Sequence, residues 1–346
     1  MSADAYNQMK KGEFTMRIKK NLLLSAVILI LAGSLFGQSS ALYVSVLQTQ
    51  SYIVGGKNPP TGLYFHKQDT VWGHLGWDNV RNFGATFVPG QSNTMYLACG
   101  NGVFRTRDGG QNWKITTGWE ITEVLDIAVQ PGNPANLLAA TAYGIWSSDN
   151  SGETWSEANS GIEHTFTQTI RFDRTARNRV LAGSEETLYY SDDGGKNWRS
   201  IGPKDITIRT VEQSPVDPDL WMAGTMDEGI LRSGDGGRTW NRLSGTIRDE
   251  TIYAIAFHPG DPSRIAAGGF DTGVLISGDG GKTWEKTEDD LPVSDIHSLA
   301  FDPDQSGRIW AGTVGRGVYY SDDNGASWHY AGLNGSEVWD MMFVVE

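Results

Sequence analysis

Aspartates at regular intervals are the first residues of this 346-residue chain whose type and spacing could do chemistry. Six eight-residue boxes share a Ser or Thr at the first position, a Gly at the fifth and a Trp at the eighth; the third position is Asp in five and Asn150 in one. Such aspartates could bind metal or act as acids and bases. Near-copies at regular intervals indicate a turn that recurs in each repeat of the structure, and not a single active site. The boxes are TRDGGQNW (106–113), SDNSGETW (148–155), SDDGGKNW (191–198), SGDGGRTW (233–240), SGDGGKTW (277–284) and SDDNGASW (321–328).

The residue types of the box predict a self-locking hairpin turn. Short polar side chains at the first and third positions can accept hydrogen bonds from backbone N–H groups of the turn. The glycine allows a positive φ, and the tryptophan can pack a large apolar face back on the hairpin.

The spacing of the boxes predicts the fold. Their tryptophans are 42, 43, 42, 44 and 44 residues apart, a period typical of repeat architectures. Within one repeat, TIYAIAF and RIAAGG precede the box, VLIS runs into it and TWEKT begins a fourth strand, which gives four short strands. Four strands in about 43 residues is the pattern of a propeller blade, and the arithmetic of the chain gives seven blades.

The two ends of the repeat region predict how the ring closes. Gly62–Trp72 is a degenerate copy of the box, and SYIVGG (Ser51–Gly56) resembles the second strands of other repeats. SEVWDMMFVV (Ser336–Val345) resembles their first strands. We therefore expect an all-β, seven-bladed β-propeller with four antiparallel strands in each blade. The C-terminal strand joins N-terminal strands in one blade, which removes free sheet edges.

The N-terminal region predicts export. Residues 1–15 are polar and suggest an N-terminal extension or an upstream start. Residues 16–41 combine basic residues, an apolar run over 21–37 and small residues, as in a secretory signal peptide cut after Ala41. We expect a periplasmic or extracellular propeller over 42–346, without membrane insertion after cleavage. The alternative is an uncleaved anchor helix, since the apolar run is at the short limit for spanning a bilayer.

The net charge limits the classes of partner, and the cysteine content limits the disulfides. Residues 42–346 carry 23 basic and 39 acidic side chains, a net charge of −16. This argues against nucleic acid and allows a basic or cationic partner, although solubility alone would also explain it. The single cysteine, Cys99, lies in an expected second strand, so we predict a core residue and no internal disulfide.

Candidate binding residues lie on the face that carries the loops after strands two and four, here called the upper face. We align the first strands of the repeats on the residue that is Pro in most of them. The residue four before this position is apolar in every repeat, whereas the residue six before it is polar or aromatic in several repeats. Large polar and aromatic groups on one side of a ring suit a small concave site. The alternative is that they fill the channel mouth, with Arg209 paired to Asp295 or Glu250. The position six before Pro holds Phe83, Leu125, Gln168, Arg209, Tyr253, His297 and Trp339.

From this set we select Gln168, Arg209, Tyr253, His297 and Trp339 as ligand-binding candidates, and we add the loop residues Asp227, Asp271 and Arg316. We identify no catalytic residue, since nothing singles out a pair among Asp227, Asp271 and Asp295. We expect no metal site, because no His/Asp cluster has ligand spacing. No cofactor is implied.

SGDGGKTW, AFHPGDP and RIAAGG together resemble the Asp-box (BNR-repeat) propeller superfamily over nearly all of the chain after Ala41. Sialidases of this group carry an Arg-Ile-Pro motif that is absent here. Sortilin-type receptors add a cysteine-rich module, which is missing. The chain is similar in organisation to single-domain photosystem II assembly-factor propellers, which bind other proteins, but their basic contact patch is not evident in this acidic chain.

Xyloglucanase-type glycosidases also have a similar repeat, and Asn79–Arg105 resembles their opening blade. In that family an Asp follows the second strand and a second propeller completes the cleft. Here Leu97–Gly102 has no acid, and the chain has only one propeller.

These resemblances lead to two hypotheses. The first is a non-catalytic exported propeller, monomeric as a fold, that binds a protein partner or helps assemble an envelope complex through its upper face. The second is a glycan-active or glycan-binding protein. A glycosidase would need two carboxylates roughly 5–9.5 Å apart at the scissile bond.

Overall fold

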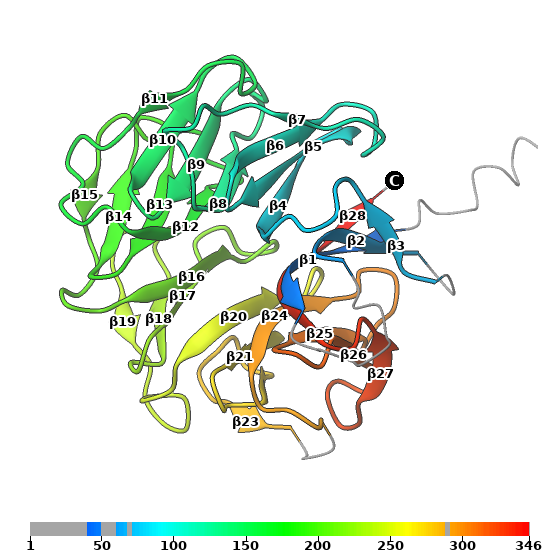
Figure 1. Cartoon of the computed structure of the whole chain (residues 1–346). Coiled ribbons are helices and arrows are strands. Elements are labelled where there is room, and N and C mark those ends of the chain that lie inside the picture. The colour runs from blue at the N-terminus through cyan, green and yellow to red at the C-terminus, as the bar shows by residue number, and fades with distance from the viewer. Residues whose placement is uncertain (1–39, 50–59, 68–70, 288–290, 346) are drawn as a thin grey trace, which may run out of the picture. The chain divides into compact units, whose positions relative to one another are not determined.

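The computed structural model describes residues 40–49, 60–67, 71–287 and 291–345, and these residues form seven sheets, each of four antiparallel strands. The sheets follow one another around a ring, which confirms the seven-bladed, all-β propeller (Figure 1). A single compact unit extends from Ser40 to Val344. No helix within the described ranges is long and apolar enough to cross a membrane.

Six blades are built from consecutive strands, with the first strand of each lying innermost. The first strands of neighbouring blades lie side by side around the central channel. Blade 1 is β4 (Asn82–Val88), β5 (Gln91–Cys99), β6 (Gly102–Thr106), β7 (Lys114–Ile115); blade 2 is β8 (Val124–Val129), β9 (Leu137–Thr141), β10 (Gly144–Ser148), β11 (Ser156–Glu157); blade 3 is β12 (Thr167–Phe172), β13 (Val180–Ser184), β14 (Leu188–Ser191), β15 (Arg199–Ser200); blade 4 is β16 (Ile208–Gln213), β17 (Trp221–Thr225), β18 (Ile230–Ser233), β19 (Asn241–Arg242); blade 5 is β20 (Ile252–Phe257), β21 (Ile265–Gly269), β22 (Val274–Ser277), β23 (Glu285–Lys286); and blade 6 is β24 (Ile296–Phe301), β25 (Ile309–Thr313), β26 (Val318–Ser321), β27 (His329–Gly332).

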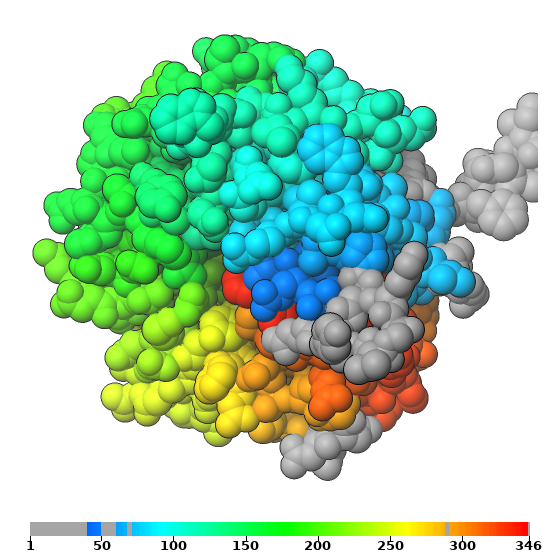
Figure 2. All heavy atoms as spheres, in the orientation of Figure 1, coloured from blue at the N-terminus to red at the C-terminus, as the bar shows by residue number. Residues whose placement is uncertain are grey.

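Blade 7 joins the two ends of the propeller. Its strand order is β28 (Ser336–Val345), β1 (Ser40–Thr49), β2 (Gly62–His66) and β3 (Gly73–Leu75), so the C-terminal strand is innermost, as expected. In Figure 2 red atoms of the C-terminal segment lie beside blue atoms at the middle of the ring. Gln48 Nε2 donates to Glu337 Oε1 at 2.7 Å across this closure.

One detail of the predicted closure was wrong. The second strand of blade 7 is β1 (Ser40–Thr49), whereas the sequence favoured Ser51–Gly56, which lies outside the described residues. Strand β1 is buried on both faces, so its sequence ALYVSVL lacks a polar alternation. Such a run cannot be told by periodicity from the apolar segment just before it.

The beginning of β1 bears on the predicted cleavage point. Ser40 and Ala41 are buried strand residues, and the Ser40 amide donates to Asp304 Oδ2 at 2.7 Å. A cut after Ala41 would remove both residues from β1. The predicted signal segment otherwise lies outside the described residues.

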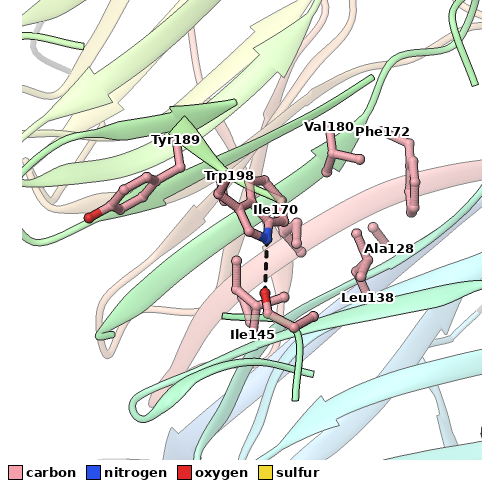
Figure 3. Close-up of a cluster of buried hydrophobic side chains, with 11 residues drawn as sticks. Ala128, Leu138, Ile145, Ile170, Phe172, Val180, Tyr189 and Trp198 are labelled. Atoms are coloured by element: carbon pink, nitrogen blue, oxygen red, sulfur yellow. Dashed lines mark hydrogen bonds between the residues drawn. The ribbon is translucent and has the colours of Figure 1, made fainter. Parts of the chain in front are cut away.

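The core lies between neighbouring blades. The apolar position of the first strands is buried in every blade, and Cys99 is fully buried, as predicted. Figure 3 shows one such cluster, where Ile170 and Phe172 from β12 pack near Leu138 from blade 2 and Trp198. The Trp198 Nε1 donates to Ala158 O at 2.9 Å, so this box tryptophan ties blade 3 to blade 2.

The boxes lock their own turns. In the fifth box, Ser277 Oγ donates to Asp279 Oδ1 at 2.9 Å and accepts the Gly281 amide at 2.9 Å, while Asp279 accepts the Thr283 amide at 3.0 Å. Asn150 plays the same part in the second box and accepts the Thr154 amide at 2.9 Å. An amide that replaces a carboxylate without loss of geometry supports a structural role.

The ionisation of the box aspartates agrees with that role. A hydrogen bond from Asn112 holds the pKa of Asp108 at about 2, and one from Ser327 holds the pKa of Asp323 at about 2. These carboxyls stay ionised near neutral pH and cannot serve as general acids there. No group of three or more potential metal ligands occurs in the part of the chain that the structure describes.

Candidate functional site: the channel mouth

A β-bulge in the first strand of blades 1 to 6 positions six of the mouth residues. In blades 1 to 6 the pairing of the first and second strands shifts register across one residue, for example between Ile208 and Thr210 in blade 4. A bulge leaves an extra residue unpaired and re-aims its side chain. The residues skipped are those six before the Pro position: Phe83, Leu125, Gln168, Arg209, Tyr253 and His297. The position where the repeats admit polar and aromatic side chains is therefore the position that is left out of the pairing between the first and second strands.

These side chains and Trp339 of blade 7 touch one another from blade to blade. The Tyr253 and His297 rings meet edge to face at 4.5 Å between centroids, and His297 meets Trp339 at 4.6 Å. Trp339 in turn meets Phe83 at 5.8 Å. The aromatic half of the mouth is thus a continuous wall from blade 5 through blade 7 to blade 1.

Arg209 joins this wall to the polar half of the mouth. Its Nη1 donates to Gln168 Oε1 at 2.9 Å, and its guanidinium lies 5.3 Å from the centre of the Tyr253 ring. Its Nε is buried and has no hydrogen-bond partner among the described residues. The ion pair with Asp295 or Glu250 that the sequence suggested as an alternative is not formed.

His297 is neutral at the mouth. Burial lowers its pKa to about 4, with Arg209 adding to the shift and Asp295 opposing it. At neutral pH the ring therefore acts as an aromatic wall with one donor and one acceptor nitrogen.

The loop candidates are not part of this wall. Asp227 Oδ1 accepts the Thr251 hydroxyl at 2.6 Å, and Asp271 Oδ1 accepts the Ser294 hydroxyl at 2.7 Å. The Asp271 amide donates to Asp295 Oδ1 at 2.9 Å. In blades 4 and 5 these carboxylates thus connect the loop between the second and third strands to the loop that leads from the fourth strand into the next blade. Arg316 is exposed on the loop between β25 and β26.

A second polar cluster, which sequence reasoning missed, lies deeper in the channel. Arg171 in β12 pairs with Asp126 in β8 and, at 3.0 Å, with Glu212 in β16. Asp126 also accepts the Ile170 amide at 2.9 Å, and Asp340 accepts the Ala85 amide at 3.2 Å in the same way. Each aspartate thus links the first strand of its blade to that of the next. The two share one register position, five before Pro, which is the signal that sequence comparison could have used.

Asp126 and Asp340 approach each other across Gly84. A Cβ on Gly84 would lie 3.5 Å from Asp340 Oδ2 and 3.9 Å from Asp126 Oδ1. Burial raises the pKa of Asp340 to about 6, and the nearby Asp126 and Glu212 add to the shift, although Arg171 and the Ala85 amide pull it down. The channel thus contains a carboxyl that is partly protonated at mildly acidic pH.

Asp340→Asn should therefore stabilise the protein at pH 7.5. The folded pKa of Asp340 lies above the unfolded value, so its contribution to stability is present below about pH 4 and is lost as the pH rises through 6. Asparagine keeps the acceptor for Ala85 without the charge. We expect a gain of about 1–2 kcal/mol, less than the ~3 kcal/mol of full linkage, because the side chain lines a channel. Urea unfolding at pH 7.5 and pH 4.5 measures it, and the gain should shrink at the lower pH.

His297→Phe is the control of opposite sign. The folded pKa of His297 is below the unfolded value, so its contribution is present above about pH 6.5 and is lost as the pH falls through 4. With Phe at position 297, the free energy of unfolding should therefore fall less steeply as the pH is lowered below 6.5. A gain for Asp340→Asn that is equal at both pH values would contradict the raised pKa.

The fold and mouth define a class: an Asp-box propeller whose boxes are structural and whose bulged first strands build a mixed aromatic and polar mouth. The sequence profile of the Sortilin-Vps10 family (sortilin, neurotensin receptor 3) matches residues 101–217 and 228–339. The chain therefore belongs to this family. The matched residues belong to the propeller repeats, and not to the cysteine-rich module that sortilin-type receptors add. No curated protein matches the chain in sequence.

Solved structures show the same fold. The GH74 xyloglucanase from Xanthomonas campestris superposes with a TM-score of 0.65 and 18% identity, covering 88% of this chain and 54% of that one. YCF48 from Cyanidioschyzon merolae gives 0.57 and 17%, covering 75% and 87%. A YCF48 structure bound to D1 peptide gives 0.54 and 15%, covering 75% and 95%. The chain spans about half the length of the GH74 xyloglucanase, so the likeness is one of fold to both groups.

Proposed function

We propose that this chain is an exported, non-catalytic propeller that binds a protein partner through its upper face and so helps assemble or stabilise an envelope complex. The observation that carries the proposal is the bulge-built mouth. Register shifts in blades 1 to 6 place side chains that contact one another at one end of the channel. Arg209 Nε is buried and has no hydrogen-bond partner in the described chain, so this donor remains available at the mouth.

The carboxylates support a binding role over hydrolysis. Asp227 and Asp271 accept hydrogen bonds from neighbouring loops, and Asp295 accepts an amide, so each has a structural task. The structure of a YCF48 propeller with a bound peptide shows that a propeller of this fold can hold a polypeptide.

A glycan ligand is the second candidate. Exposed aromatic rings on the upper face favour it, with Trp119 91% exposed and Tyr143 64% exposed, because flat rings can stack on sugars. The fold likeness to GH74 enzymes points the same way. Unchanged turnover of every glycan substrate after Asp227→Ala and Asp271→Ala would remove those two residues from a catalytic role.

Affinity capture from an envelope extract of the source organism tests the protein-binding role. We expect the mature protein to retain one stoichiometric partner, and Arg209→Glu to reduce capture about tenfold or more, as expected for reversal of a central charge. The matched control is Arg238→Glu, which makes the same charge change at a box turn on the opposite face. Equal capture by wild type and both variants would contradict a mouth-based site, and a blank would shift weight to glycans.

A further inference from the structure

The upper face has the larger excess of acidic over basic side chains. Its described loops carry 13 carboxylates and 4 basic side chains. The described loops of the opposite face carry 15 carboxylates and 10 basic side chains, so their excess of negative charge is smaller. The upper carboxylates are Asp78, Glu120, Glu123, Glu163, Glu185, Glu186, Asp205, Asp227, Glu228, Asp249, Glu250, Asp271 and Asp295, and the basic residues are Arg81, Lys204, Arg248 and Arg316. An excess of this kind produces a negative potential that steers cations toward one face.

Some of these charges are already neutralised within the fold. Arg242 pairs with Glu228 and, at 2.9 Å, with Asp249. His164 lies 2.9 Å from Glu186. By contrast, Glu120, Glu163 and Glu185 are exposed, and none forms an ion pair within the described ranges. These three belong to the loops between β7 and β8, β11 and β12, and β13 and β14.

The same stretch of the ring presents two exposed aromatic side chains. Trp119 is 91% exposed beside Glu120, and Tyr143 is 64% exposed on the loop between β9 and β10. We call Trp119, Glu120, Tyr143, Glu163 and Glu185 the docking arc. Trp and Tyr are enriched at protein interfaces because each combines a large apolar ring with a polar group.

Hydrogen bonds join the loops of the docking arc in two neighbouring pairs. The Ala142 amide donates to Glu123 O at 3.2 Å, which joins the loops bearing Tyr143 and Trp119. The Glu185 amide donates to Phe166 O at 3.2 Å, which joins the next pair. The Glu163 amide donates to Tyr189 Oη at 3.0 Å and anchors its loop to blade 3. The arc is therefore held in place before any partner arrives, which lowers the entropy cost of binding.

Exposed carboxylates interleaved with aromatic faces match the chemistry of lysine and arginine. A carboxylate pairs with either cation, and an aromatic face attracts a cation placed over the ring. An anionic lipid surface or a nucleic acid would be repelled by the same face. We propose that the docking arc binds a Lys/Arg-rich polypeptide segment of the partner; this rests on the proposed protein-binding function and specifies the chemistry of its partner.

A labelled peptide of alternating Lys and Tyr, with a Glu/Tyr peptide as its counterpart, tests the proposal by fluorescence anisotropy on the mature protein. We expect the Lys/Tyr peptide alone to bind, and to bind more weakly as salt is raised. Glu120→Gln, Glu163→Gln and Glu185→Gln combined should weaken binding about tenfold or more, as should Trp119→Ala combined with Tyr143→Ala.

The matched control is Asp149→Asn, Asp192→Asn and Asp219→Asn, which removes three exposed carboxylates from the opposite face. It should change binding by less than about twofold if the arc, and not total charge, is responsible. No binding of the Lys/Tyr peptide, or equal losses in the arc and control variants, would overturn the proposal.

Capture with the arc variant separates this inference from the function on which it rests. A native partner that is lost on Arg209→Glu but retained by the triple Gln variant would leave the protein-binding function standing and overturn the docking arc. A partner lost in both, carrying a basic segment protected by wild-type protein from proteolysis, would support both.

Discussion

Removal of Val338–Glu346 is expected to abolish cooperative folding. Strand β28 is the innermost strand of blade 7 and lies beside β1. Without it, β1 would present a free edge, and Leu42 and Val44, both buried in the intact protein, would lose cover. A free hydrophobic strand edge is a template for aggregation. The loss also breaks links to both neighbouring blades, since Ser298 Oγ donates to Val338 O at 3.0 Å and Asp340 accepts the Ala85 amide.

Size-exclusion chromatography and urea unfolding measure this effect. The truncated chain should form soluble aggregates or precipitate and should lack a sharp transition. Addition of a synthetic Ser336–Val345 peptide should restore a monomeric, cooperatively unfolding species. The same peptide with Val338→Lys and Met341→Lys should not, because both side chains are buried in the intact protein. A truncated chain that stays monomeric and unfolds cooperatively would contradict closure by β28.

Trp284→Ala is expected to cost about 3–5 kcal/mol of unfolding free energy, as for truncation of a large core side chain. Trp284 is 5% exposed and packs with Met222, Ile265 and Leu275 between blades 4 and 5. Its Nε1 also donates to Gly281 O at 3.2 Å, so the box turn loses its closing bond. Trp240 is half-buried, so Trp240→Ala should cost less.

Trp119→Ala provides the control for this experiment. The same atoms are removed, but Trp119 is 91% exposed, so stability should change by no more than about 0.5 kcal/mol. Denaturant titration of both variants gives the comparison. A cost below about 1 kcal/mol for Trp284→Ala would mean that the box tryptophans are not the packed anchors described here.

The sequence predicted the repeat, the closure and the buried apolar position because each depends on local pattern. A tryptophan after a Ser-x-Asp-x-Gly turn makes the same hairpin wherever it occurs, and the bond from Ser277 to Asp279 is one of several equivalents. Strand β1 was misplaced because strands buried on both faces lose their alternation, and here such a strand directly follows another apolar segment.

The mouth was predicted only in part. The change from Phe83 and Leu125 to Gln168, Arg209 and His297 at one register position was visible in the aligned repeats, but the bulges that re-aim these side chains were not. The links from Asp126 and Asp340 depend on amides of neighbouring blades, about 44 residues away for Ile170 and 255 for Ala85. The shared register position of the two aspartates could have been seen in the aligned repeats, but the amides that they accept are set by the ring geometry.

The pairing of β28 with β1 in blade 7 has a consequence for biosynthesis. Gln48 and Glu337 meet although 289 residues separate them along the chain. Strand β1 leaves the ribosome early and must wait for blades 1 to 6 before its inner partner exists. Throughout that interval the edge of β1 that β28 will cover is free, so a holding factor or a translocation channel that shields β1 would have its greatest value before the final blade is completed.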